Sequence, residues 1–341
     1  MYRMKIIIIG LNWLGDVIMS LPAIAAVSEK AETHIVTRPH LKEVYDLSGL
    51  SLHVHCVQSK NGFFETIKET RKLRALSADC VLVFPDSLRA AMVSKMCGAK
   101  HSIGFKSQFR NIFLDNNVPK PENYKEVHES KLYCKLVKEV GITDFDYTFN
   151  PKKFEKSFFE KTCEKAGILP QKPYVIIAPG AAFGAAKRWP PEKFAEVAKL
   201  IRKHEPDKRI IITAGNNEKA IADEISKLLP ENTFIDAVGK TSITELGCLL
   251  SQCSLLLAND SGTMHLAALY QTPTVVPVGP TDMTRTGALN INFRPVISDA
   301  CEKIPCRKRV CPLKTHACMQ SISASDIYNV SAELRKISKP Y

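Results

Sequence analysis

Three short blocks of the sequence carry small, polar and charged residues directly after apolar runs. The first, Gly10-Leu-Asn-Trp-Leu-Gly-Asp16, ends in a carboxylate that can serve as a general base toward a hydroxyl group. The second, Pro179-Gly-Ala-Ala-Phe-Gly-Ala-Ala-Lys-Arg-Trp-Pro190, carries two cations and leads into a helix start marked by proline. The third, Ala258-Asn-Asp-Ser-Gly-Thr-Met-His265, leads into another helix start. Helix N-termini bind anions, so the blocks suggest base catalysis beside a phosphate site.

Asp16 has two possible roles. As an N-cap or first-turn residue it would interact favourably with the helix dipole and stabilise the helix. At the rim of a cleft, with Asn12 and Gly15 in the same loop, it would act as a general base toward a sugar hydroxyl. A dinucleotide-binding fingerprint is excluded, because Asn12 occupies the middle glycine position and no clear acid ends a second strand.

The second block predicts a phosphate site. Its small residues leave backbone N–H groups accessible, and Lys187 and Arg188 stand just before the helix start. The spacing of a P-loop is absent. The alternative is a flexible connector with both cations solvated, but the convergence of amides, Lys187 and a helix N-terminus favours phosphate binding.

The third block predicts a second anion-binding helix start. Asp260, Ser261, Gly262 and Thr263 follow a buried type of strand and precede an apolar helix. Ser261 or Thr263 can instead be plain N-caps. His265 lies inside the helix, where packing or capping is a more common role for histidine than catalysis.

Glu218 follows another apolar run, after Gly215-Asn-Asn. An acid at the end of a strand commonly reaches the ribose hydroxyls in nucleotide sites. The same position suits an acid that stabilises a helix start, and the sequence leaves both readings open.

Alternating strands and helices must position these blocks. Apolar runs predict strands at Lys5–Gly10, His34–Thr37, Asp79–Phe84, His101–Gly104, Tyr174–Pro179, Arg209–Ala214, Phe234–Ala237, Ser254–Ala258 and Thr274–Val278. Amphipathic stretches predict helices at Asp16–Ser28, Phe64–Leu76, Ser87–Cys97, Glu126–Val140, Pro191–His204, Glu218–Leu229, Ile243–Ser251, Thr263–Tyr270 and Ala324–Ile337. This alternation is typical of an α/β fold, in which ligands bind at the carboxyl ends of parallel strands.

The 341 residues suit two domains, and the proline-containing stretch Thr148–Pro173 is the best boundary between them. We expect Rossmann-like domains at residues 1–160 and 161–322, with a last helix in residues 323–341 that packs back toward the first domain. A cleft between two such sheets is a natural active site.

The overall charge narrows the choice of partners. A net charge of +12 favours phosphorylated substrates, nucleic acid or an anionic membrane surface. No nucleic-acid-binding motif stands out, which argues against RNA or DNA. The apolar run Ile6–Ile9 is too short for a membrane span and lacks the layout of a signal peptide, so we expect a cytoplasmic protein.

Four of the eleven cysteines cluster near the C-terminus: Cys301, Cys306, Cys311 and Cys318. Four thiols can form a tetrahedral zinc site, although these spacings are looser than the usual paired C-x2-C arrangement. The neighbouring lysines and arginines favour thiolates and can contact anionic partners; a solvated basic face is the alternative. We expect a reduced structural cluster or an adventitious disulfide rather than a bound metal.

These blocks, in this order, resemble the lipopolysaccharide heptosyltransferases, and within them the heptosyltransferase II branch. The matching segments are Trp13–Ala23, Pro179–Pro190, Asn259–Ala268, Val278–Thr281 and Cys306–Met319. The resemblance implies a GT-B fold, which is α/β with two Rossmann-like parallel-sheet domains facing a central cleft. It also implies that the first domain binds the acceptor and the second binds the nucleotide sugar.

The activity implied by the resemblance is an inverting transfer of L-glycero-D-manno-heptose. The donor would be ADP-L-glycero-β-D-manno-heptose, and the acceptor the heptosyl-Kdo-lipid A inner core of lipopolysaccharide. Asp16 matches the family's general base, and Lys187 its diphosphate-binding lysine. Asp260 matches an acid that contacts the donor sugar, and the backbone of residues 261–263 matches a segment that binds the diphosphate. Glu218 matches an acid that binds the ribose.

We expect no cofactor and no metal, because no Asp-x-Asp pair lies in these motifs. The expected partners are the nucleotide sugar and a lipid-linked acceptor, with peripheral contact of a monomer at the cytoplasmic face of the inner membrane. One alternative is a GT-B enzyme with another sugar nucleotide or acceptor, such as a UDP-sugar transferase or epimerase. Another is a non-enzymatic protein that binds nucleic acid or membranes through its basic tail.

Overall fold

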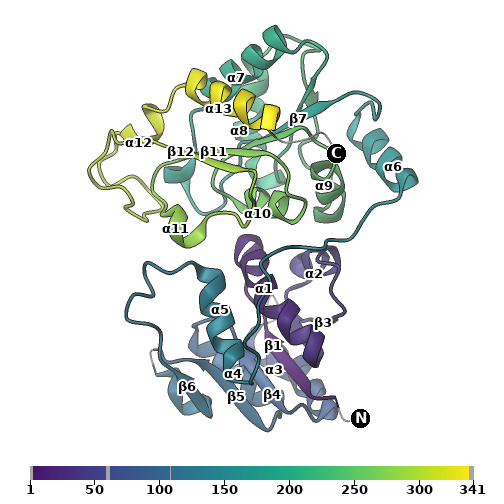
Figure 1. Ribbon diagram of the computed structural model, residues 1–341, viewed down its shortest axis with the longest axis vertical. Helices are drawn as coiled ribbons and strands as arrows, with labels where there is room; N and C mark the ends of the chain where they lie inside the picture. The colour runs from purple at the N-terminus through teal and green to yellow at the C-terminus, as the bar shows by residue number, and fades with distance from the viewer. Residues whose placement is uncertain (1–2, 59–61, 108, 338–341) are drawn as a thin grey trace. The chain divides into compact units, whose positions relative to one another are not determined.

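Two parallel β-sheets of six strands each organise the chain (Figure 1). The computed structural model describes residues 3–58, 62–107 and 109–337, with the side chains of residues 62–64 excepted. The chain divides into two units, Met1–Lys152 and Lys153–Tyr341. This division falls inside the predicted boundary stretch Thr148–Pro173, and each unit contains one sheet.

The first unit contains β1 to β6 and α1 to α5. The strands are β1 (Lys5–Ile9), β2 (Glu32–Thr37), β3 (His53–Cys56), β4 (Cys80–Val83), β5 (His101–Phe105) and β6 (Asn116–Val118). The helices are α1 (Leu14–Lys30), α2 (Lys42–Leu47), α3 (Gly62–Arg71), α4 (Leu88–Met96) and α5 (Glu129–Lys138). The central strand β1 is a run of isoleucines that is almost fully buried, as expected for a parallel sheet covered on both faces.

The second unit repeats this alternation. Its strands are β7 (Tyr174–Ala178), β8 (Arg209–Ile212), β9 (Ile235–Asp236), β10 (Leu255–Ala258), β11 (Thr274–Val278) and β12 (Phe293–Ile297). Its helices are α6 (Lys156–Ala166), α7 (Pro191–His204), α8 (Lys219–Lys227), α9 (Ile243–Leu250), α10 (Gly262–Leu269), α11 (Met283–Thr286), α12 (Ala317–Gln320) and α13 (Ala324–Ile337).

Both sheets have the strand order of a Rossmann fold. The first runs β3-β2-β1-β4-β5-β6, and the second runs β9-β8-β7-β10-β11-β12. The order therefore reverses between β1 and β4 in one sheet and between β7 and β10 in the other. Ligands of such sheets bind beyond the carboxyl ends of the strands at this reversal. The loops after β1, β7 and β10 are the three blocks that the sequence singled out.

The predicted elements are confirmed at the centres of both sheets, and α7, β11 and α13 have the predicted bounds. Three strands were missed: β3, β6 and β12. All three lie at sheet edges, where a strand pairs on one side and keeps polar or exposed residues. Helix α5 begins at Glu129 rather than Glu126, because His128 caps it by accepting a hydrogen bond from the Ser130 amide.

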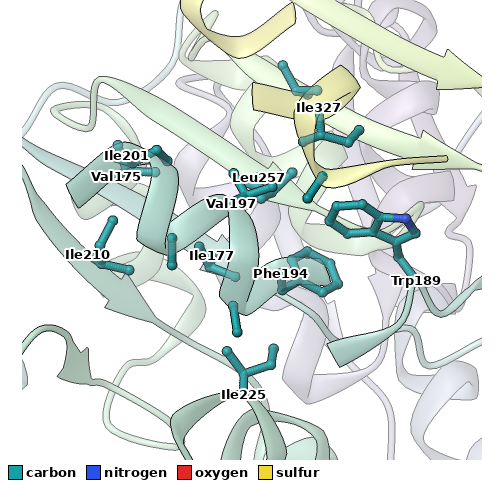
Figure 2. Packing of buried hydrophobic residues seen from close by; sticks show 14 of the residues in the cluster. Val175, Ile177, Trp189, Phe194, Val197, Ile201, Ile210, Ile225, Leu257 and Ile327 are labelled. Carbon is teal, nitrogen blue, oxygen red and sulfur yellow. The ribbon is translucent and has the colours of Figure 1, made fainter. Parts of the chain in front are cut away.

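The core of the second unit lies between its sheet and the helices α7 and α13 (Figure 2). Trp189, at the end of the loop after β7, is fully buried there, and its ring meets that of Phe194 edge-on at 4.9 Å. The indole Nε1 donates a hydrogen bond to the Ile322 carbonyl at 3.2 Å. The end of the loop after β7 is thus anchored in the core, and this anchor also restricts the position of the residues that precede Trp189.

The last helix packs within the second unit, where α13 contacts α7, β11 and β12. The predicted packing of residues 323–341 toward the first domain stays a prediction, and residues 338–341 lie outside the described part. Within the described residues, no helix combines the length and apolarity that a membrane span requires.

Candidate functional site

Asn259 fixes the loops after β7 and β10 to each other. Its side chain is fully buried; Oδ1 accepts a hydrogen bond from the Trp189 amide at 3.0 Å, and Nδ2 donates one to the Pro179 carbonyl at 2.7 Å. These two partners bracket the second sequence block. One buried amide therefore holds both ends of the Lys187 loop against the segment that follows β10 and carries Asp260.

Lys187 and Asp260 meet at this reversal of the strand order. The Lys187 Nζ lies 2.6 Å from Asp260 Oδ2, and both side chains are largely buried. The same ammonium stands over the Phe183 ring, 4.7 Å from its centroid. The structure thus brings together the cation of the second block and the carboxylate of the third, two residues that the resemblance assigns to donor binding.

The start of α10 adds backbone donors. Ser261 occupies the N-cap position but makes no side-chain capping hydrogen bond, and Ser261, Gly262 and Thr263 are all partly exposed. The Ser261 side chain therefore does not cap this helix. The first amides of α10 remain available at a helix terminus that favours negative charge.

Glu218 lies against the backbone of Gly180. A Cβ atom at Gly180 would stand 2.1 Å from Glu218 Oε2, so only glycine leaves room for the carboxylate. Glu218 closes a short 3₁₀ turn, Asn216–Glu218, after β8. Its Oε1 is buried and has no hydrogen-bond partner among the described residues. A buried carboxylate oxygen in this state is positioned to accept hydrogen bonds from ligand hydroxyl groups.

A cationic pocket of about 480 Å³ adjoins the Lys187 loop. It is lined by Phe183, Lys187, Thr281, Asp282, Arg285 and Arg307, among others. The Arg307 Nη2 is 2.8 Å from Asp282 Oδ2. Sequence reasoning did not assign Arg285 or Arg307 to this site, because they come from α11 and from the cysteine-containing loop, far along the chain. Arg188 is exposed and is not among the lining residues.

In the first unit, Asp16 lies in the first turn of α1. The N-cap position is Trp13, which makes no side-chain capping bond, so Asp16 is a first-turn acid rather than the cap. Asp16 and Gly15 are partly exposed, while Trp13 and Asn12 are exposed. The carboxylate therefore stands at the carboxyl edge of the sheet, beside the reversal between β1 and β4, where a ligand can reach it.

A second basic pocket, of about 560 Å³, opens beside the same loop. Its lining includes Gly10, Asn12 and Arg38, which follow the carboxyl ends of β1 and β2, and Ser87 and Arg89 at the start of α4. Asn12 Oδ1 accepts a hydrogen bond from Arg38 Nε at 2.6 Å, which fixes this guanidinium over the loop. Asn12 thus positions a cation, and the pocket suits an anionic ligand.

A buried arginine supports the neighbouring loop. Arg110 is fully buried, and its Nη1 donates a hydrogen bond to the Pro85 carbonyl at 2.5 Å. Burial lowers the pKa of its guanidinium, although Asp86 opposes this shift. Arg110 belongs to no recognisable motif, so sequence reasoning missed this support for the loop after β4.

Among the described residues, two groups of side chains are candidate metal ligands. Glu32, His34 and His53 bring possible ligand atoms within 4.8 Å of one another. The four clustered cysteines line one pocket together with His316. Burial raises the pKa of the Cys311 thiol, but hydrogen bonds from the backbone amides of His316, Leu313, Lys314 and Thr315 outweigh it and leave the pKa below its ordinary value.

The chain matches the family described as glycosyltransferase family 9 (heptosyltransferase) over residues 67–317. It is 31% identical to lipooligosaccharide heptosyltransferase 2 of Campylobacter jejuni serotype O:6 over 350 residues, which cover 99% of this chain and 100% of the relative. It is 27% identical to lipopolysaccharide heptosyltransferase 2 of Escherichia coli K12 over 314 residues, covering 85% and 87%.

Solved structures agree on the fold. The structure of E. coli ADP-heptose LPS heptosyltransferase II superimposes with a TM-score of 0.83 at 21% identity, covering 98% of this chain and 99% of that one. The family 9 glycosyl transferase from Veillonella parvula gives a TM-score of 0.86 at 19% identity, covering 98% of both chains. These likenesses confirm the GT-B class, with two Rossmann-like parallel-sheet domains.

Proposed function

Because the chain belongs to glycosyltransferase family 9, the heptosyltransferase family, we propose that it transfers L-glycero-D-manno-heptose from ADP-heptose to the heptosyl-Kdo-lipid A inner core of lipopolysaccharide. The observation that carries the proposal is the meeting of Lys187, Asp260 and the α10 N-terminus where the strand order reverses. Such a site suits a diphosphate next to a sugar.

In the proposed reaction, the acceptor hydroxyl oxygen attacks the anomeric carbon of the heptose. The bond from this carbon to the diphosphate breaks, and ADP leaves with the bonding electrons. The proton of the hydroxyl passes to the Asp16 carboxylate, which acts as the general base. Inversion at the anomeric carbon follows from this single displacement.

Charge on the leaving diphosphate grows as the bond breaks. Lys187, Arg307 and Arg285 supply positive charge in one pocket, and the α10 amides supply oriented donors. Groups that are already held in place cost no reorganisation when the charge develops, so they stabilise the transition state more than the bound donor. We assign Asp260 to a hydroxyl of the donor sugar and Glu218 to the ribose.

The acceptor is assigned to the pocket of the first unit. Arg38 and Arg89 line it, and the inner core carries carboxylate and phosphate groups that such cations bind. We further propose that the protein works as a monomer in peripheral contact with the cytoplasmic face of the inner membrane, consistent with its net charge of +12. The transfer is assigned no cofactor.

The test is ADP release by the purified protein from ADP-heptose, measured with and without heptosyl-Kdo-lipid A. We expect release that depends on the acceptor. No release with any inner-core acceptor would contradict the proposal. A thermal-shift series of ADP-, UDP- and GDP-sugars addresses the alternative donor: we expect ADP-sugars to raise the melting temperature most, and stabilisation by UDP-sugars alone would favour a UDP-sugar transferase or epimerase.

A further inference from the structure

Four cysteines converge on one pocket outside the nucleotide site. We define the cysteine loop as residues 298–316, between β12 and α12; it carries Cys301, Cys306 and Cys311, and Cys318 follows on α12. All four line a single pocket. None is in a disulfide bond, and Cys318 is buried while the other three are partly exposed. The fold therefore gathers thiols that are as many as 17 positions apart, counting from Cys301 to Cys318.

The loop backbone turns tightly after Cys311. Cys311, Leu313 and His316 line the pocket, and His316 adopts a left-handed conformation with φ of 50°. Lys314 closes a turn by donating to the Cys311 carbonyl at 3.2 Å, and it adopts a left-handed conformation with φ of 59°. These turns place Cys311 in the wall of the pocket that the other three cysteines also line, and the thiolate is the form of cysteine that binds metals.

The sequence alone favoured a reduced cluster or a disulfide over a bound metal; because the fold gathers all four cysteines on one pocket, we propose instead that Cys301, Cys306, Cys311 and Cys318 bind one thiophilic transition-metal ion, zinc or iron, through four thiolates. Tetrahedral four-sulfur coordination is the geometry that these ions take in structural sites. With metal–sulfur bonds of about 2.3 Å, the sulfur atoms must stand roughly 3.8 Å apart. No three of these four sulfur atoms, all of them described, now lie within 4.8 Å of one another, so binding draws the loop inward.

The histidine group on the first sheet is the rival metal site. Glu32, His34 and His53 already have ligand atoms within 4.8 Å of one another. However, His34 is engaged at both ring nitrogens: Nδ1 is 2.9 Å from His55 Nε2, and Nε2 is 3.0 Å from Glu32 Oε1. This arrangement satisfies a buried imidazole by hydrogen bonding alone and requires no ion.

The cysteine loop borders the proposed nucleotide site. Ala186 donates its amide hydrogen to the Arg309 carbonyl at 3.0 Å, and Arg307 donates its amide hydrogen to the Pro280 carbonyl at 2.8 Å. A Cβ atom at Gly184 would lie 2.5 Å from the Arg309 carbonyl oxygen, so the two loops are in close contact. An ion held by the cysteines fixes the backbone that places Arg307 beside Lys187.

The first experiment measures metal in the unmodified protein. Untagged full-length protein, purified under reducing conditions, is analysed by inductively coupled plasma mass spectrometry. We expect about one zinc or iron ion per chain. After chelation, addition of Co²⁺ alone should produce intense thiolate-to-cobalt charge-transfer absorption. Protein that contains no metal and gives no such absorption would overturn the proposal, as would a disulfide among these four cysteines in protein kept reduced.

Variants locate the ion. We expect Cys311→Ser and Cys306→Ser to lower the metal content to roughly a tenth or less of the unmodified level. Cys56→Ser, which changes an exposed cysteine on β3, and His53→Ala, which breaks the rival group, should keep it. Metal that is lost in His53→Ala and kept in Cys311→Ser would assign the ion to the histidines and refute the cysteine site.

The link to the nucleotide pocket rests on the proposed function and has its own measurement. ADP binding is followed by calorimetry for the metal-loaded protein and for Cys306→Ser. We expect an affinity lower by about 10-fold in the variant, because Arg307 loses its fixed position. If the cysteines bind metal but the ADP affinity is the same in the variant, the metal site is supported and its link to nucleotide binding is rejected. Metal binding in a protein that binds no ADP would count against the proposed function alone.

Discussion

Gly180 and Glu218 meet where β7 and β8 end, and their contact leads to a prediction at the scale of single residues. Glu218→Gln should weaken ADP binding by about 10-fold, because a carboxylate that accepts ribose hydroxyls contributes about 1.4 kcal/mol more than an amide. The unmodified protein should prefer ADP to dideoxy-ADP, which lacks both ribose hydroxyls, and the variant should lose most of this preference. Calorimetric titration with both nucleotides measures it.

Two glycines provide matched controls for this assignment. In Gly180→Ala the new Cβ occupies the place of the carboxylate, so it should displace Glu218 and reproduce the effect of Glu218→Gln. Gly215→Ala lies near the same carboxylate, but its Cβ would stand at an ordinary 3.9 Å, and it should bind ADP normally. If all these variants prefer ADP to dideoxy-ADP as strongly as the unmodified protein does, Glu218 does not bind the ribose.

Asp16 is the residue on which the chemistry depends. Asp16→Asn keeps the size of the side chain and removes the base, so kcat should fall by about 100- to 10,000-fold while KM for ADP-heptose changes little. Asp46→Asn, which affects an exposed acid paired with Lys42 on α2, is the control and should keep full activity. Steady-state ADP release measures both variants; a kcat for Asp16→Asn within a factor of about three of the unmodified enzyme contradicts the assignment.

Individual site residues could be predicted from the sequence only where they lie together in one continuous block. Lys187 and Asp260 stand next to helix starts preceded by small residues, so the sequence alone predicted an anion site at each. Arg285 and Arg307 reach the same pocket from segments that have no anion-binding pattern of their own. Their convergence is a property of the folded chain, because strand order and loop packing bring these segments together.

At the scale of elements, Asn259 joins the loops that follow β7 and β10. Asn259→Ala should lower the free energy of unfolding by about 2–5 kcal/mol, since it leaves the Trp189 amide and the Pro179 carbonyl buried without these partners. Gln252→Ala, at an exposed position near the start of β10, is the control and should change stability by less than about 0.5 kcal/mol. Urea denaturation measures both; equal stability of the two variants would refute the bridging role.

The pairing of β2 with β3 should make stability depend on pH. Burial lowers the pKa of the His34 and His55 rings, although the hydrogen bond that His34 donates to the Glu32 carboxylate opposes the shift at His34. The unfolded chain then binds more protons than the folded one below about pH 6.5, so stability is complete above this pH and is lost as the pH falls. His34→Gln should show a smaller loss between pH 7.5 and pH 5.

Chemical denaturation at the two pH values measures this difference. His101→Gln, which changes an exposed histidine at the start of β5, serves as the control and should keep the full pH dependence. A pH dependence that is the same in His34→Gln and in the unmodified protein would show that the buried imidazole is not its source.

Element prediction succeeded where burial imposes a pattern. The central strands β1, β7 and β10 are buried on both faces and read as continuous apolar runs. The edge strands β3 and β6 carry the sequences HVHC and NNV, which show no such run. Their pairing depends on a neighbouring strand already in place, so the local sequence contains little information about them.

At the scale of the whole molecule, two units repeat one strand order, and each presents a basic pocket at the carboxyl end of its sheet. This duplication explains why one chain can recognise two anionic substrates, with the unit that carries Lys187 assigned to the donor and the unit that carries Asp16 to the acceptor. It also explains why the fold class was predictable, since alternation of strands and helices recurs along both halves.

The central claim is heptose transfer, and one competition reaction tests it most directly. Purified protein is incubated with heptosyl-Kdo-lipid A and equal concentrations of ADP-heptose, UDP-glucose and GDP-mannose, and the acceptor is analysed by mass spectrometry. The account predicts an acceptor heavier by one heptose residue and by no hexose. An unchanged acceptor, or one that gains a hexose, would contradict it.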